Sequence, residues 1–208
     1  MLRILVVGLI MLVAAMALMP RRSVPPPENA TEWPQQRALP IVALRDHTGA
    51  EFSTAELTDR FSLLFFGFAN CPDICPASLA VLAQASERLA AARTPVPRVV
   101  LLSVDPARDT PEQLRRYLAR FDDEFIGATA EMARLEPLLT ALGVTVMRQS
   151  LGAQQYNMTH NPQVYVIAPN GNVIATLSSA SSADAVVRDY QRIRARFLSG
   201  ASAAAPPQ

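Results

Sequence analysis

The sequence contains no lysine, and its 19 basic side chains are all arginines, scattered along the chain in doublets at most. A nucleic-acid-binding surface requires a basic stripe or a platform of aromatic side chains, and the sequence has neither. The formal net charge is +1, half of the residues are hydrophobic and 18% are charged. This composition is typical of a globular protein and excludes nucleic-acid binding as a function class.

Cysteine and histidine are also scarce, with two of each. The two cysteines, Cys71 and Cys75, lie four residues apart. In an oxidising compartment such a pair forms a disulfide unless it is maintained as thiols or occupied by a metal. The sequence therefore allows a structural disulfide, a redox-active dithiol or part of a metal site.

An uninterrupted apolar run extends from Ile4 to Met19, between Arg3 and the doublet Arg21-Arg22. As a helix it would span roughly 24 Å, and arginines at both ends can extend its reach across a bilayer. We expect residues 1–20 to be a transmembrane anchor, with a cleaved signal peptide as the alternative. No cysteine stands directly after the run, so we expect no lipoprotein processing. Either segment would place the remaining chain at the periplasmic face of the inner (cytoplasmic) membrane.

The rest of the chain divides by composition into three parts. Three consecutive prolines at 25–27 favour a stiff, proline-rich linker over residues 21–40. Residues 41–198 carry the periodic patterns of a folded domain. The low-complexity residues 199–208 are expected to form a disordered tail.

The domain alternates between apolar runs of strand length and amphipathic helical segments. Alternating units predict a parallel sheet covered on both faces, here a thioredoxin-like α/β sandwich with an N-terminal hairpin. Thr110, Pro111 and Gln113 predict a helix start with a capping box. The expected strands are 41–44, 51–52, 61–68, 98–104, 163–167 and 173–177, and the expected helices follow Cys75 and Thr110 and cover 131–142 and 186–197.

Cys71 and Cys75 stand where the buried strand 61–68 leads into a helix. Free backbone N–H groups at a helix start favour thiolates, which are both nucleophiles and metal ligands. Two thiolates on one loop repel each other, and a bound cation relieves that repulsion. The spacing is one residue longer than the C-x-x-C of dithiol oxidoreductases, and it permits either a disulfide or a shared metal.

Four segments together resemble the Sco/SenC family of copper proteins needed for cytochrome c oxidase assembly. They are FGFANCPDICP at 66–76, LLSVDPARDTPEQLRRYLARFD at 101–122, FIG at 125–127, and the His160 segment leading into VYVIAPNG at 164–171. The resemblance implies a thioredoxin fold that binds one copper ion through Cys71, Cys75 and His160. Thiolates select Cu(I), and imidazole suits both Cu(I) and Cu(II). The implied function is that of a copper chaperone, and the implied partner is the copper-receiving subunit of cytochrome c oxidase.

Two positions depart from the family pattern. Thr159 replaces an acidic residue that family members commonly carry before the histidine, so the support of the imidazole must come from elsewhere. Pro162 stands at the start of a strand, where redox thioredoxins carry a cis-proline. The Asn161–Pro162 peptide bond can therefore be cis, as in those proteins, or an ordinary trans bond. We predict the cis bond, with His160 in a loop that points at the cysteines. His47 is expected to be a surface residue.

Two further functions use the same residues. A thiol-disulfide oxidoreductase would use Cys71 and Cys75 to reduce the cysteines of the copper target, and a redox or copper sensor would report the state of the site to a partner. Whether the protein is an enzyme therefore stays open at the level of sequence.

Overall fold

The computed structural model describes residues 24–152, 155–178 and 181–200. An eight-stranded sheet in the order β1-β10-β9-β4-β5-β6-β2-β3 forms the centre of the domain. The strands are β1 (Ala30–Ala38), β2 (Ala43–Asp46), β3 (Glu51–Ser53), β4 (Ser62–Gly67), β5 (Arg98–Ser103), β6 (Ile126–Thr129), β7 (Val146–Gly152), β8 (Gln155–His160), β9 (Gln163–Ile167) and β10 (Asn172–Ser178). The helices are η1 (Thr54–Leu57), α2 (Ile74–Ala91), α3 (Pro111–Leu118), α4 (Met132–Leu142) and α5 (Ala183–Leu198).

Strands β4 and β5 occupy the middle of the sheet and pair in parallel, with Phe65 opposite Leu101. Every residue of β4 is buried, because helices cover both faces of the sheet at this point. A strand buried on both faces needs a continuous apolar sequence, which explains the run of leucines and phenylalanines there. The expected central strands are confirmed.

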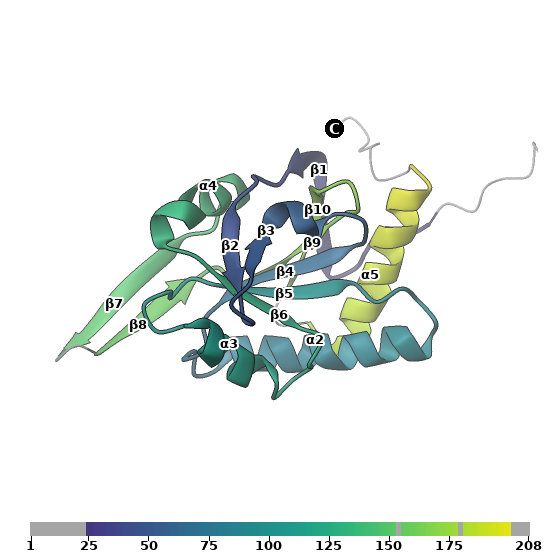
Figure 1. Cartoon of the computed structure of the whole chain (residues 1–208). Helices are drawn as coiled ribbons and strands as arrows, with labels where there is room; N and C mark the ends of the chain where they lie inside the picture. Colours follow the sequence, from purple (N-terminus) through teal and green to yellow (C-terminus); the bar gives the residue numbers. More distant parts are fainter. Residues whose placement is uncertain (1–23, 153–154, 179–180, 201–208) are drawn as a thin grey trace, which may run out of the picture.

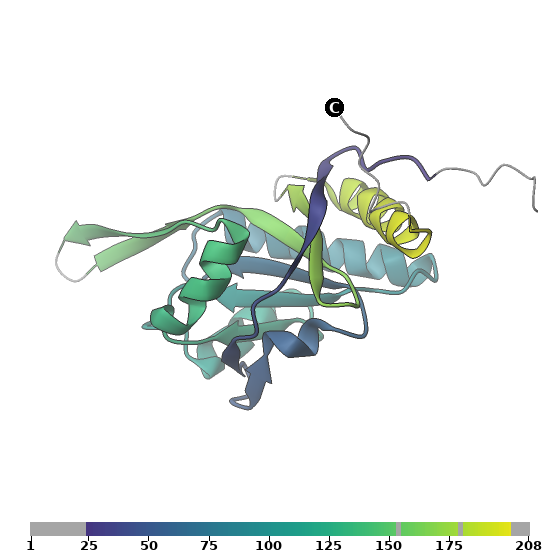
Figure 2. The same cartoon turned by 90° about the horizontal axis from the view of Figure 1, so that it is seen from above.

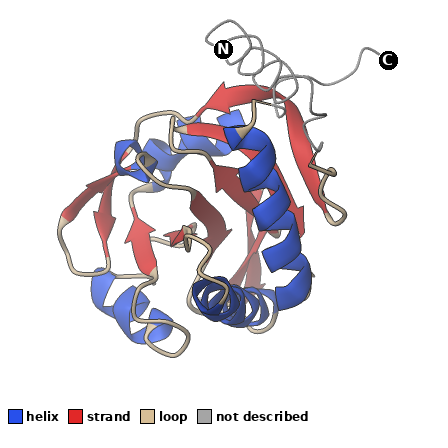
Figure 3. Ribbon diagram, turned by 90° about the vertical axis from the view of Figure 1, so that its right-hand side faces the viewer, coloured by secondary structure: helices blue, strands red, loops and turns tan. Residues whose placement is uncertain are grey.

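The helices form a layer on each side of the sheet. Figure 1 shows α2 and α3 below the sheet and α4 above it, and Figure 3 shows α5 running along one side. Phe61 packs edge-on against Tyr190 of α5, and Phe66, on the opposite sheet face, packs against Tyr165. The Tyr165 hydroxyl donates to the carbonyl of Leu142 at the end of α4. This three-layer arrangement confirms the predicted α/β sandwich.

The helix starts and stops follow their sequence signals, with one difference. The Thr110 hydroxyl accepts the backbone N–H of Gln113 as expected of an N-cap. The Gln113 side chain accepts from Arg116 instead of reaching back, so only half of the predicted capping box forms. Helix α4 ends at Gly143 in the left-handed conformation, with φ +65°, which glycine adopts without steric cost.

Part of the expected linker is a strand of the sheet. β1 pairs antiparallel with β10, and the register shifts between Glu32 and Arg37, so Pro34 lies within an irregularity at the sheet edge. Proline lacks a backbone donor, and edge strands and bulges are the positions where a sheet tolerates it. The segment before β1 is held to α5, because the backbone N–H groups of Glu28 and Asn29 both donate to the buried carboxylate of Asp189.

A two-stranded antiparallel ribbon, β7 and β8, projects from the domain (Figures 1 and 2). We expected His160 in a loop, and the structure corrects this: His160 is the last residue of β8. The sequence analysis does not predict this ribbon, because β7 is almost wholly exposed and the two strands pair only with each other.

Within the described ranges, no helix has both the length and the apolar character needed to cross a membrane. The expected anchor, residues 1–20, and most of the expected tail lie outside the described residues.

Candidate metal centre

The two cysteines lie where β4 leads into α2, at the carboxyl end of a central strand. Cys71 is half-buried in the loop, and Cys75 is fully buried in the first turn of α2. The backbone N–H of Cys75 donates to Cys71 Sγ over 3.4 Å, so the sulfur takes the place of an N-terminal capping acceptor. Both side chains are free thiols in this structure.

His160 brings its ring to the cysteines from the end of β8. Its Nε2 lies 3.6 Å from Cys75 Sγ. The ring packs edge-on against Phe65 and Phe68, with centroids 6.1 and 6.2 Å away. Nδ1 lies 3.0 Å from the carbonyl oxygen of Asn161, and because a carbonyl only accepts, Nδ1 must carry the proton of this hydrogen bond. The lone pair is then on Nε2, which faces the sulfur.

The hydrogen bond from His160 Nδ1 to the Asn161 carbonyl orients the imidazole, a role for which the sequence offers no acidic residue at position 159. Thr159 is exposed and pairs across the ribbon with Met147, and its uncharged side chain cannot act as the carboxylate of the family pattern. A backbone carbonyl is one of the usual partners that orient a ligating histidine. The carbonyl of Asn161 therefore performs the orienting role that the family pattern would give to an acidic residue at 159.

The two thiols differ in acidity. The pKa of Cys71 is lowered to about 6, chiefly because the Cys75 thiol donates a hydrogen bond to it, with the backbone N–H groups of Cys75 and Asp73 adding to the effect and burial opposing it. The pKa of Cys75 is raised, because its proton is held by Cys71 and because burial disfavours its charged form. In the copper-free site these opposite shifts favour ionisation of Cys71 over ionisation of Cys75.

The donor set suits a soft metal ion. Two sulfurs and one imidazole nitrogen are ligands of the kind that Cu(I) selects. Among the described residues, no three His, Cys, Asp or Glu side chains are already gathered as in a metal-bound site. Cys75 and His160 are within reach of a common ion, and the Cys71 sulfur lies at hydrogen-bonding distance from the Cys75 thiol.

A buried carboxylate fixes the loop that carries the cysteines. Asp109 is 0% exposed, and its Oδ2 accepts from the backbone N–H of Ala69 and from the Ser103 hydroxyl. Its Oδ1 has no hydrogen-bond partner among the described residues. Burial raises the pKa of Asp109. The end of β5 is thereby joined to the loop just before Cys71.

A second contact joins the ribbon to the domain. The Tyr156 hydroxyl donates to the buried Asp105 over 2.7 Å. The Tyr156 ring is stacked by Arg108 and Arg148, each 3.8 Å from its centroid. Arg108 also pairs with Asp105 at 2.5 Å and donates to the Tyr156 carbonyl. We call these four residues the Tyr156 clamp, and it fixes β8 four residues before His160.

A cavity of about 260 Å³ opens over the site. Cys71, Asp73, Met158 and His160 are among its lining residues, whereas Cys75 is not. Cys75 therefore lies behind the surface that solvent reaches.

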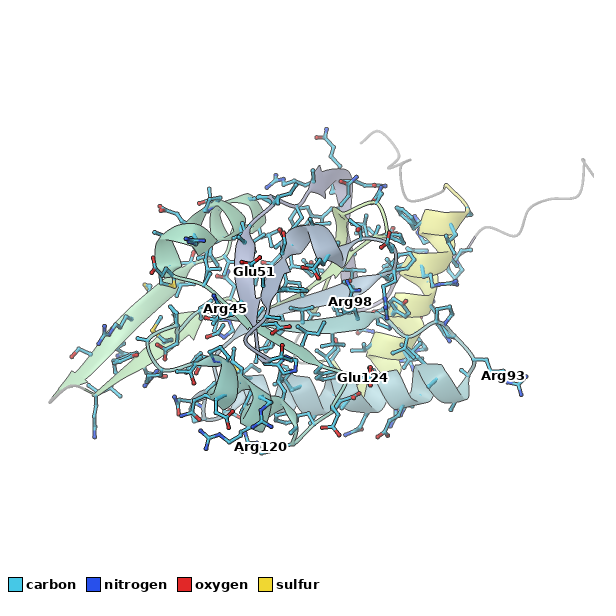
Figure 4. All side chains as sticks on the ribbon, viewed as in Figure 1. Arg45, Glu51, Arg93, Arg98, Arg120 and Glu124 are labelled. Carbon is cyan, nitrogen blue, oxygen red and sulfur yellow. The ribbon has the colours of Figure 1, made fainter. Side chains whose placement is uncertain are left out.

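Two larger hollows, of about 540 and 640 Å³, lie elsewhere. Arg45 and Glu51 border the first, and Arg98 and Glu124 border the second. Figure 4 labels these side chains, with Arg45 and Glu51 on β2 and β3 and Arg98 on β5. Neither hollow is lined by a cysteine, and a single metal ion needs no cavity of this size.

Two expectations about single residues can be compared with the structure. The Asn161–Pro162 peptide bond is trans, so the predicted cis bond is wrong. The trans bond leaves the Asn161 side chain bonded to the backbone N–H of Thr145 and its carbonyl against His160. His47 is half-buried and accepts the backbone N–H of Gly127, outside the cysteine site.

Comparison with known proteins shows the family to which the chain belongs. The profile of the SCO1/SenC family matches residues 36–195. The chain belongs to the SCO1/SenC family. It is 34% identical over 165 residues to a candidate copper-binding protein of Stutzerimonas stutzeri, which covers 79% of this chain and 81% of the relative.

More distant relatives share the same domain. The mitochondrial SCO2 homologue of Bos taurus is 30% identical over 159 residues, which span 76% of this chain and 60% of that protein. The crystal structure of Arabidopsis thaliana ScoI with copper bound superposes with a TM-score of 0.71 at 26% identity, over 76% of this chain and 99% of that structure. The thioredoxin-like fold is confirmed by this superposition.

The sequence located the cysteine pair and His160, but it missed the residues that hold them. The sequence shows Asp105, Arg108 and Asp109 only as members of the segment 101–122 that resembles the Sco/SenC family, with no role of their own. Tyr156 and Met158 precede His160 at intervals of two, so the alternation from 155 to 160 could have predicted a strand. The hydrogen bonds that join these residues across the fold have no signal in the sequence.

Proposed function

We propose that this SCO1/SenC protein is a copper chaperone that binds one copper ion through Cys71, Cys75 and His160 and assists assembly of the dinuclear copper centre of cytochrome c oxidase. The observation that carries the proposal is the 3.6 Å approach of His160 Nε2 to Cys75 Sγ, across 85 residues of sequence. Copper is bound by the Arabidopsis relative. The chain supplies two sulfurs and an oriented imidazole, which suit Cu(I) and, through the nitrogen, Cu(II).

The assembly role has a further source of support. BsSco, a structural relative at 22% identity and TM-score 0.63, is a member of the Sco family of cytochrome c oxidase assembly proteins. The partner we propose is the subunit that receives copper. A three-ligand site leaves copper accessible to a competing ligand, as delivery requires.

A second function, thiol-disulfide exchange, is favoured by the lowered pKa of Cys71. In that reaction the Cys71 thiolate attacks a disulfide of the target, and Cys75 then resolves the mixed disulfide. The target gains two electrons and two protons, and the protein is left with a Cys71–Cys75 disulfide. BsSco carries a disulfide switch, which supports the same chemistry in this fold.

One experiment separates the two functions. The protein loaded with Cu(I) and the copper-free dithiol are each mixed with the copper-receiving domain of the oxidase, once reduced and once oxidised. A chaperone transfers copper to the reduced domain. A reductase converts the oxidised domain to thiols without metal. If the copper remains on the protein in the first mixture, delivery is refuted.

We also propose that residues 1–20 remain attached and hold the domain at the periplasmic face of the membrane. The apolar run between arginines supports this. The mass of the native protein tests it, because a mature N-terminus at Leu18 would show cleavage after Ala17 and refute the anchor.

A further inference from the structure

The face of β8 that carries His160 also carries a third sulfur. Side chains two residues apart on a strand point to the same side, so Met158 shares the face of His160. Both residues line the 260 Å³ cavity together with Cys71. Met158 is 9% exposed and belongs to the buried apolar cluster of the domain, and the Tyr156 clamp lies two residues earlier on the same strand.

The layout of this cavity separates the sulfurs by accessibility. Cys71 and Met158 line the cavity, whereas Cys75 is fully buried and is not among its lining residues. An ion that arrives from solvent, or leaves for a partner, therefore meets Cys71 and Met158 before it meets Cys75. A thioether is a soft, uncharged donor that prefers Cu(I) over Cu(II) and keeps its lone pairs at every pH.

We propose that Met158 is an additional sulfur ligand for Cu(I), which it binds together with Cys71 at the opening of the cavity. This inference rests on the proposed copper-binding function. It assigns a role to a residue that the cysteine-histidine set does not include. Copper stays Cu(I) throughout, and only its sulfur ligands change as it moves between the opening and the buried Cys75.

The chain offers a matched control in Met147. It lies on β7 opposite Thr159, so it faces away from His160, and it is 60% exposed. Met158→Leu and Met147→Leu remove the same atoms, and a leucine conserves most of the methionine volume. The comparison therefore isolates the position of the thioether.

The test measures Cu(I) and Cu(II) affinities of the full chain by competition with chelators of each ion. Met158→Leu should weaken Cu(I) binding by about tenfold, the lower end of what loss of a supporting metal contact costs, and leave Cu(II) binding unchanged. Met147→Leu should change neither affinity. Equal losses for both ions in Met158→Leu would indicate a packing role and overturn the proposal.

A second measurement detects the contact between Met158 and Cu(I) directly. With ¹³C-labelled methionine methyl groups, addition of Cu(I) should shift the Met158 signal and leave the Met147 signal in place. An unmoved Met158 signal in a protein that holds one copper ion would overturn this inference alone. Absence of copper binding by the unsubstituted chain would overturn the proposed function as well.

Discussion

Cys71 should react as a thiolate at neutral pH, and this depends on one neighbour. With its pKa lowered from 9.0 to about 6, about nine in ten Cys71 side chains are ionised at pH 7. At the ordinary pKa the fraction would be about one in a hundred. The leading cause is the hydrogen bond from the Cys75 thiol. Alkylation of copper-free, reduced protein with iodoacetamide, followed by peptide mass spectrometry, should give a rate at Cys71 with a midpoint near pH 6.

Two variants at position 75 test the cause. Cys75→Ala removes the donor, so the midpoint of Cys71 alkylation should rise toward 9. Cys75→Ser retains an O–H donor at the same place, so its midpoint should remain near that of the unsubstituted protein. A wild-type midpoint near 9 would refute the thiolate, and a midpoint near 6 in Cys75→Ala would show that another group lowers the pKa.

The same shift affects stability. Because the folded-state pKa of Cys71 lies below its unfolded value, the ionised thiol stabilises the fold fully above pH 9 and loses this effect as the pH falls through about 6. The free energy of unfolding should therefore rise with pH between 6 and 9 in the unsubstituted protein. This rise should be smaller in Cys71→Ser, whose hydroxyl does not titrate in that range.

Three further substitutions test the site and its supports. His160→Ala should abolish the sulfur-to-Cu(II) absorption band and retain part of the Cu(I) binding, since two thiolates hold Cu(I) but Cu(II) prefers nitrogen; an unchanged band would point to another ligand. Tyr156→Phe leaves the buried Asp105 without one hydrogen-bond donor. The free energy of unfolding, measured in urea, should therefore fall by about 1–3 kcal/mol; an unchanged urea midpoint would show that the Tyr156 clamp does not stabilise the fold. Gly67→Ala would place a Cβ 3.3 Å from Cys75 Sγ and 2.8 Å from a neighbouring leucine methyl, so it should destabilise by about 1–3 kcal/mol and weaken copper binding. Wild-type stability and affinity in Gly67→Ala would show that the packing relaxes freely.

The sequence predicts the part of the fold in which one local pattern has one physical explanation. Residues 61–68 are apolar apart from Ser62 because β4 is buried on both faces. Gly143 follows the last periodic residue of α4 because a left-handed residue ends the helix there. The placement of Cys71 in the loop after the strand and of Cys75 in the first turn of the helix follows from the same patterns.

The sequence does not predict elements that are stabilised by partners far away in the chain. β1 contains Pro34 and polar residues, so nothing local indicates a strand, and it exists because β10 offers an open edge. The β7–β8 ribbon is missed for a different reason: it is a local hairpin, but its strands pair only with each other and β7 is almost wholly exposed, so no buried face marks it in the sequence. The conformation of Pro162 was wrongly predicted because X-Pro isomers differ by only about 0.5–1 kcal/mol, so tertiary contacts such as the Asn161–Thr145 hydrogen bond decide between them.

The most direct test of the copper site is the metal content of the purified protein and its serine variants under reducing conditions. The unsubstituted protein should bind one equivalent of copper, with sulfur and nitrogen ligands in its X-ray absorption spectrum. Cys71→Ser and Cys75→Ser should each lose stoichiometric binding, because one thiolate and an imidazole hold Cu(I) weakly. If Cys75→Ser still bound one equivalent at wild-type affinity, the assignment of the site would be contradicted.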